Sequence, residues 1–303
     1  MSSASTLEER PIQRRTAQGY RRTGSFDLRA LWTLYTLTLR QHLNGRRWMI
    51  CAVLFLLPAA LVLLLRGSHA RFPAMGMEFQ FIYMFIPQGL LPLLALLYSS
   101  GLVQDEQEEQ TITYLLIRPI SKWALYIVKL LATLTTTATL TFLFTSLTFV
   151  AIYFHAASAP VDVMHRCLIT ASIHALAVSA YCCLFGMISI LTKRTLIVGI
   201  LYIAIFEGLL ANLPLSIRSL TVIFYARMIA YRTLSFAVPF PGRTIDFAAE
   251  GWQLDVANDP QLLEYPQRMT CILILLAGSL AFTIIAAILC SQKEFHVKTP
   301  EKN

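Results

Sequence analysis

Long apolar runs alternate with short polar segments along most of the chain. Six runs hold roughly 17 to 30 residues each, enough to cross a hydrocarbon core of about 30 Å at about 1.5 Å per residue. The pattern predicts an all-α polytopic membrane protein with six transmembrane helices. The predicted spans are Trp48 to Leu65, Phe79 to Ser100, Trp123 to Phe154, Cys167 to Leu191, Thr195 to Leu213 and Met269 to Leu289.

Polar segments flank this six-span domain, which is expected to occupy residues 48–291. Residues 1–25 are polar and rich in arginine, and are predicted to be a disordered cytoplasmic tail. Leucines and aromatic residues then recur at helical spacing, which predicts an amphipathic helix over residues 26–47 on the cytoplasmic face. Residues 292–303 are expected to form a second cytoplasmic tail.

The outer segment between the fifth and sixth spans, about residues 212–268, is the least regular. Residues 213–240 carry a helical rhythm interrupted by three arginines, each costing about 2.5 to 3.5 kcal/mol at membrane depth. Short helices at the outer surface are therefore predicted rather than a seventh span. Five acids and paired Gly and Pro breakers predict a loop over residues 239–266.

Composition and charge agree with a membrane location. The chain is 56% hydrophobic and 14% charged, with a mean hydropathy of +0.60, which excludes a single soluble core, a collagenous chain and a disordered protein. The net charge of +8 would suggest nucleic acid as a partner of a soluble protein, but here it follows membrane topology. Most Lys and Arg residues, including nine arginines before Trp48, share the side of the N-terminus. Both termini are therefore predicted to be cytoplasmic, in the plasma or inner membrane.

Membrane lipids are expected partners of the N-terminal tail. Arg14, Arg15, Arg21 and Arg22 are available to anionic headgroups, at about 1 kcal/mol each near the surface. A solvated tail without a specific partner is the alternative.

The segment between the second and third spans has the most distinctive pattern. Four acids begin a predicted short helix, about residues 104–118, where the helix dipole favours negative charge. Ile112, Leu115 and Leu116 share one face of that helix. Pro119 ends it, and Ser121 can cap the third span. An acidic, solvated connector is the ordinary interpretation of such a loop, but the shared apolar face favours a docking surface for a second protein.

These residues resemble the cytoplasmic signature of type-2 ABC transporter permeases. In that family, acids precede Gly-Thr, Leu-Leu, then Pro-Ile/Val-Ser/Thr-Arg and a later Lys. The chain carries Gln110 where Gly is usual and Lys122 where Arg is usual, and it ends the pattern with Lys129. The resemblance identifies as ATPase-coupling residues Asp105, Glu106, Glu108, Glu109, Thr111, Ile112, Leu115, Leu116, Pro119, Ser121 and Lys122.

The resemblance also implies a fold, partners and a function. The family has an amphipathic helix before six spans, a coupling helix after the second span, and short outer helices before the sixth. The resemblance implies that the chain is a permease subunit used for export. Such a subunit pairs with a second copy or a related permease and with separate ATPase subunits. The chain has no GxxxxGK[ST] phosphate loop, so ATP and magnesium are expected on the ATPase and no cofactor on this chain.

Other polar residues of the spans have competing interpretations. Glu207 lies inside an apolar run, so it is either a functional intramembrane acid or a structural one, paired with Arg218 or reaching the interface. His155, His165 and His174 match no metal-ligand spacing and are interpreted as loop and interface residues. The six cysteines are interpreted as small core residues. The threonines of the third span fit a permease dimer interface or a translocation path, and helix packing is favoured.

Two other functions remain alternatives to a permease. A membrane-embedded enzyme acting on lipid needs paired acids or a His/Asp/Ser group at one depth, and the sequence shows none. A membrane scaffold that docks a cytoplasmic partner without transport shares the same docking helix. The transported substrate is not specified by the sequence.

Overall fold

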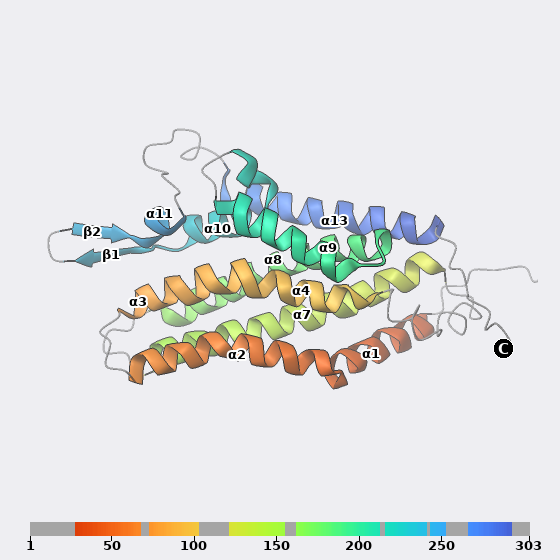
Figure 1. Ribbon diagram of the computed structural model, residues 1–303, viewed down its shortest axis with the longest axis horizontal. Helices are drawn as coiled ribbons and strands as arrows, with labels where there is room; N and C mark the ends of the chain where they lie inside the picture. Colours follow the sequence, from red (N-terminus) through yellow and green to blue (C-terminus); the bar gives the residue numbers. More distant parts are fainter. Residues whose placement is uncertain are drawn as a thin grey trace, which may run out of the picture.

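The structure, a computed structural model, describes residues 28–67, 73–102, 121–154, 162–212, 216–240, 243–252 and 266–292. Within these residues, six helices are long and apolar enough to cross a membrane, and they run side by side (Figure 1). They are Arg47–Gly67, Ala74–Ser99, Lys122–Tyr153, Val163–Leu191, Thr195–Asn212 and Arg268–Gln292. The prediction of an all-α polytopic protein with six spans is therefore confirmed. The predicted tail at residues 1–25 lies outside the described residues.

Several of the spans are composed of more than one helical element. The elements from the N-terminus to the third span are α1 (Leu28–Asn44), α2 (Arg46–Gly67), α3 (Ala74–Met77), the π-helix η1 (Glu78–Leu90), α4 (Leu91–Ser99) and α7 (Lys122–Tyr153). The following spans are α8 (Val163–Leu191), α9 (Thr195–Tyr202) with the π-helix η2 (Ile203–Leu209) and η3 (Leu210–Asn212), and α13 (Arg268–Gln292). Between η3 and α13 lie η4 (Ser216–Leu220), α10 (Val222–Thr233), β1 (Ala237–Phe240), β2 (Arg243–Asp246) and α11 (Phe247–Trp252).

The bundle has two distinct ends (Figure 1). The hairpin end carries α3 and the two strands, which extend beyond the spans. The α1 end carries the start of α1, the start of α7 and the end of α13.

The fourth span, α8, is the centre of the bundle. In the most apolar stretch of α8, 72% of the residues are buried. The corresponding share of buried residues is 11% in α13 and 22% in the fifth span. Helix α8 packs against α4, α7, α10 and α13. In a membrane the exposed apolar faces of the outer spans contact lipid, so only the inner face of each needs protein packing.

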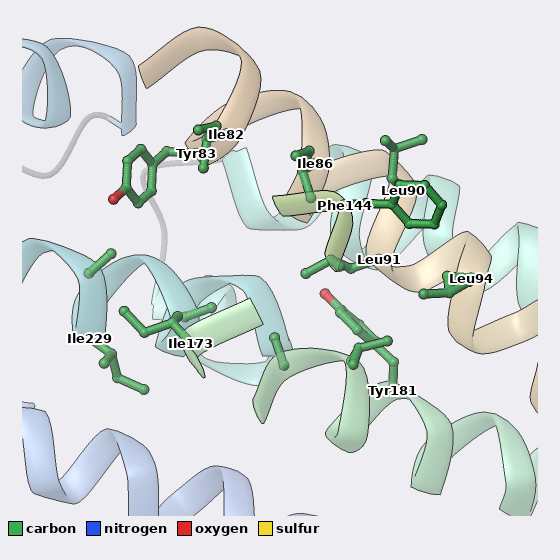
Figure 2. Close-up of a cluster of buried hydrophobic side chains, with 14 of the residues drawn as sticks. Ile82, Tyr83, Ile86, Leu90, Leu91, Leu94, Phe144, Ile173, Tyr181 and Ile229 are labelled. Atoms are coloured by element: carbon green, nitrogen blue, oxygen red, sulfur yellow. The ribbon is translucent and has the colours of Figure 1, made fainter. Parts of the chain in front are cut away.

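The second span contributes the other side of the main core. Figure 2 shows Ile82, Ile86 and Leu90 of this span lying across from Ile173 and Tyr181 of α8. The span changes from π-helix to α-helix at Leu91, between Pro87 and Pro92, neither of which provides a backbone N–H group for the helical ladder.

Helix α1 is amphipathic, as the spacing of its apolar residues predicts, and it contacts the bundle through one edge of that apolar face. Leu34 and Thr38 are buried, and the Tyr35 hydroxyl donates to Thr135 Oγ1 of α7 at 3.0 Å. Leu28 and Trp32 of the same helix are exposed. The exposed part of the apolar face is therefore available to the membrane surface while the side with Tyr35 packs on α7.

Short helices precede the last span, as predicted, and α10 is packed more deeply than a helix on the surface would be. Ile223, Met228 and Ile229 are buried, because α10 packs between α8 and α13.

The prediction that residues 239–266 form only loop is wrong for part of this segment. β1 and β2 pair as an antiparallel hairpin, with Ala237 opposite Asp246, since Pro-Gly breakers between two extended segments favour chain reversal.

Aromatic packing fixes the hairpin and α11 to the hairpin end of the bundle. The aromatic cluster consists of Phe79, Tyr83, Phe236, Phe247 and Trp252, with ring centroids 4.8 to 6.2 Å apart. The Asp246 carboxylate accepts hydrogen bonds from the backbone N–H groups of Ala248 and Ala249, at 3.0 and 3.3 Å, and so begins α11.

Substitution of Gly251 by Ala is expected to lower the thermal unfolding temperature of the purified protein in detergent. A Cβ atom there would lie 2.5 Å from the Phe79 ring, which its aromatic neighbours hold in place. The expected cost is about 1 to 3 kcal/mol. Gly278→Ala is the matched control, because a Cβ at Gly278 meets no atom within 4 Å. Equal melting of the two variants would contradict this packing.

Candidate functional site

The predicted coupling segment lies almost entirely outside the described residues. This applies to Asp105, Glu106, Glu108, Glu109, Thr111, Ile112, Leu115, Leu116 and Pro119. Ser121 and Lys122 are described, at the start of α7. Ser121 occupies the N-cap position with extended backbone, and its carbonyl accepts from the N–H of Leu125 at 3.1 Å. Its side chain makes no capping hydrogen bond, so the predicted side-chain cap is not formed.

The two ends of this segment are held by one apolar cluster at the α1 end, which we call the anchor cluster. Its buried members come from the end of the second span, the start of α7, and the ends of α8 and α13: Leu102, Tyr126, Leu130, Cys183, Ile190, Ala286 and Cys290. The buried Lys129 ammonium donates to the Leu102 carbonyl at 3.3 Å, which links the second and third spans directly. Residues 103–120 are therefore attached at both ends to four packed spans.

A glycine of α8 allows the anchor cluster to close. A Cβ atom at Gly186 would lie 2.8 Å from the hydroxyl oxygen of Tyr126 and 3.2 Å from Leu102. Because Tyr126 is fully buried, a larger residue at Gly186 would force this side chain or the two helices to shift.

A buried ion pair connects the spans at the hairpin end. Glu78 of η1 and Arg166 of α8 are 0% and 6% exposed, and the guanidinium donates to Glu78 Oε1 from Nη2 at 2.7 Å and from Nε at 3.1 Å. The Tyr153 hydroxyl of α7 donates to the second carboxylate oxygen. Two donors on one carboxylate oxygen and the Tyr153 hydroxyl on the other compensate the charge of the buried Glu78.

Arg166 also holds the segment that enters the hairpin. Its Nη1 donates to the Ser235 carbonyl at 3.0 Å, and its guanidinium carbon lies 5.7 Å from the ring centre of Phe236. Arg166 thus joins α8, the second span and the start of the hairpin. The sequence interpretation did not identify Glu78 or Arg166. The sequence did carry one signal. An acid and a base stand at the start of the second and fourth apolar runs, and both runs begin on the same side of the membrane.

Glu207 has a structural set of partners. Its carboxylate is 0% exposed and accepts from the backbone N–H groups of Val222 and Ile223 at 3.2 and 3.3 Å, and from the Tyr202 hydroxyl at 3.2 Å. The acid therefore sits at the N-terminus of α10, where unpaired amides and the helix dipole favour negative charge. The predicted pairing with Arg218 is wrong, because that guanidinium lies over the Phe224 ring, 5.4 Å from its centre.

Arg227 connects α10 to two spans. Its Nη1 donates to Asn212 Oδ1 at 3.1 Å and its Nη2 to Gln88 Oε1 at 3.5 Å. Burial lowers the pKa of the Arg227 guanidinium to about 10, while the Tyr181 hydroxyl and the Glu207 carboxylate raise it. The guanidinium therefore stays protonated near neutral pH and balances the charge of Glu207.

Several other polar side chains of the spans form hydrogen bonds within or between the helices of the described part of the chain. His174 is buried within α8, its Nδ1 3.1 Å from Thr145 Oγ1, so the interpretation of His174 as an interface residue is wrong. Thr136, Thr137 and Thr148 donate to carbonyls one turn back in α7, which leaves their methyl groups for helix contact. All six cysteines are buried, and none of them forms a disulfide within the described part of the chain.

The two buried acids do not form one catalytic group. Glu78 accepts from Arg166 and Tyr153, and Glu207 accepts from two backbone amides and Tyr202. Their networks share no hydrogen-bond partner among the described residues. Each carboxylate therefore fixes a different set of helices relative to one another.

Replacing either member of the ion pair is expected to destabilise the protein strongly. Glu78→Gln and Arg166→Gln each leave a buried charge without its partner, at a cost of about 3 to 5 kcal/mol. The double variant should lose clearly less than the sum of the two single losses, measured as thermal unfolding in detergent. Arg268→Gln, at an exposed position of α13, is the control. Additive losses would show that the two residues act independently.

Substitutions of Glu207 are expected to loosen the start of α10 in a defined order. Glu207→Gln keeps an acceptor oxygen for the helix amides, whereas Glu207→Leu removes it. Loss of such a capping acceptor is expected to lower the stability of the helix by about 0.5 to 2 kcal/mol. Amide hydrogen exchange at Val222 and Ile223 should be fastest in the Leu variant, intermediate in the Gln variant and slowest in the natural protein. Exchange in α13 is the internal reference. Unchanged exchange in the Leu variant would disprove the capping role.

Comparison with known proteins agrees with this architecture. A family model described as ABC-2 family transporter protein matches residues 46–211, from the first residue of α2 to the end of the fifth span. A comparison with curated proteins finds no match. The matched region covers more than half of the chain and includes the segment that resembles the permease signature, so the chain belongs to the ABC-2 family of transporter membrane proteins.

Proposed function

We propose that the chain is the permease subunit of an ABC exporter, coupled to separate ATPase subunits through the segment between its second and third spans. Family membership supports a transport role, and the six spans provide the membrane domain. ATP and magnesium belong to the ATPase subunits in this proposal, so hydrolysis takes place on a partner chain.

The observation that carries the proposal is the anchor cluster. Residues 103–120 begin and end on spans that are packed together with α8 and α13 and joined by the bond from Lys129 to the Leu102 carbonyl. Close-packed interiors transmit displacement because they have little free volume to absorb it. A partner that moves this segment would therefore move four spans as a unit.

The roles of the coupling residues follow from their chemistry. Glu106, Glu108 and Glu109 would pair with basic residues at the rim of a groove on the ATPase, and Asp105 adds to the same charge. Leu115, with its two apolar neighbours on the helix face, would fill the groove.

Assembly and orientation complete the proposal. We place the α1 end, with both termini, on the cytoplasmic side of the plasma or inner membrane, which puts the coupling segment within reach of a soluble ATPase. A second copy of the chain or a related permease would cover part of the exposed apolar surface of the outer spans. The direction of transport is export, and the translocation path would form between the two permeases.

Replacement of Leu115 and Leu116 by Ala together is expected to release the ATPase. We expect the amount of P-loop ATPase recovered with the tagged protein in mild detergent to fall about tenfold or more, because interface leucines are lost. The double variant Leu273→Ala with Leu276→Ala, on the exposed face of α13, is the control for the number of leucines removed.

The outcomes separate the permease from its alternatives. A natural protein that recovers no ATPase, or a partner without a nucleotide site, would favour the scaffold or the lipid-modifying enzyme. Recovery of the ATPase that is unchanged by the Leu115 and Leu116 substitutions would contradict the coupling role of this segment.

A further inference from the structure

An apolar groove lies between α2 and α7 in the half of the bundle nearer the hairpin end. It has a volume of about 550 Å³ and is lined entirely by apolar side chains. Ala59, Ala60 and Leu63 form the wall on α2, and Leu147 and Ala151 belong to the wall on α7. None of these residues takes part in the ion pair or the anchor cluster.

Residue size and aromatic stacking explain why the groove is open. Three alanines line it, so the facing surfaces of the two helices lack bulk at this level. Small residues usually allow helices to approach each other closely. Here Phe55 and Phe144 stack between α2 and α7, with ring centroids 5.3 Å apart, and keep the helices separated one turn further from the hairpin end.

Arg66 lies beside the end of the groove that is nearer the hairpin. It lies in the last turn of α2, and its Nη1 donates to the Ala151 carbonyl at 3.3 Å and to the Phe154 carbonyl. Ala151 and Phe154 also line the groove. Among the described residues, no carboxylate lies within ion-pairing distance of Arg66. A guanidinium has five donors, and both of these hydrogen bonds use the same nitrogen.

We propose that this groove binds one acyl chain of an anionic glycerophospholipid, whose phosphate is held by Arg66. A wall without polar groups gives water no hydrogen-bond partners, so hydrocarbon is the suitable occupant. From Leu56 to Leu63 the helix rises about 10 Å, which is a third of a hydrocarbon core of about 30 Å. The groove therefore takes part of a single chain, and Arg66 stands where the headgroup begins.

The charge of Arg66 selects the headgroup. An Arg in the last turn of a span, with no carboxylate beside it among the described residues, favours an anionic partner, and its planar donors match phosphate oxygens. A zwitterionic phospholipid offers the same phosphate, but the cation in its own headgroup weakens the attraction between that phosphate and Arg66. The lipid belongs to the leaflet at the hairpin end. This site does not depend on an ATPase partner or on the proposed export function.

The test uses phosphatidylglycerol with a photoreactive acyl chain, in nanodiscs that contain the full-length protein. Irradiation followed by peptide mass spectrometry should place the label on residues 56–63 and 147–154. Ala60→Phe fills the groove and should reduce this labelling about tenfold, the loss expected when contacts of about two methylene groups are removed. Leu147→Trp obstructs the groove from the opposite wall and should act alike. Ala277→Phe, also at an exposed alanine but on α13, should leave the labelling unchanged.

The headgroup is tested by competition. Unlabelled phosphatidylglycerol should displace the probe better than phosphatidylcholine from the natural protein and from Arg268→Gln. In Arg66→Gln the two lipids should compete equally. Labelling that is equal in Ala60→Phe and Ala277→Phe, or absent from both segments in the natural protein, would contradict binding of an acyl chain in the groove. A preference for phosphatidylglycerol that survives Arg66→Gln would overturn the role of Arg66.

Discussion

The ion pair between Glu78 and Arg166 holds together the hairpin ends of the second and fourth spans. Both groups are buried in the protein and removed from water, so each charge must find its partner among neighbouring residues. Arg166 meets this requirement with two bonds to the Glu78 carboxylate, one to the Ser235 carbonyl and the face of Phe236. The aromatic cluster and the hairpin are placed by the same residue, so the shape of this end depends on the pair.

The same requirement explains the fifth span and α10. Glu207 would be costly in an apolar run, but the first amides of α10 and the Tyr202 hydroxyl satisfy it. Arg227, one helix turn further along α10, extends to Asn212 and Gln88 and adds the balancing charge. Glu207, which the sequence suggests as a functional acid, thus binds the N-terminus of α10 and allows this short helix to pack inside the bundle.

The two ends of the bundle are built differently, in keeping with different roles. Charged and aromatic contacts fix the hairpin end, whereas aliphatic packing and the Lys129 bond fix the α1 end around the ends of residues 103–120. Helix α8 passes through both and is the most buried span. One continuous, largely buried helix therefore connects the anchor cluster to the Glu78–Arg166 pair.

The sequence by itself determined the six spans, the amphipathic α1 and the family, because apolar run length, helical spacing and a local motif are properties of neighbouring residues. It did not reveal the hairpin, whose strands depend on packing against the aromatic cluster. It also missed the partner of Glu207, and it missed the buried pair altogether. Glu78 and Arg166 are separated by 88 residues, and Glu207 and Val222 by 15. Only the tertiary structure decided these contacts, because a buried polar group takes whichever donor the packing of the helices brings within hydrogen-bonding distance, and that packing is not encoded in any single segment.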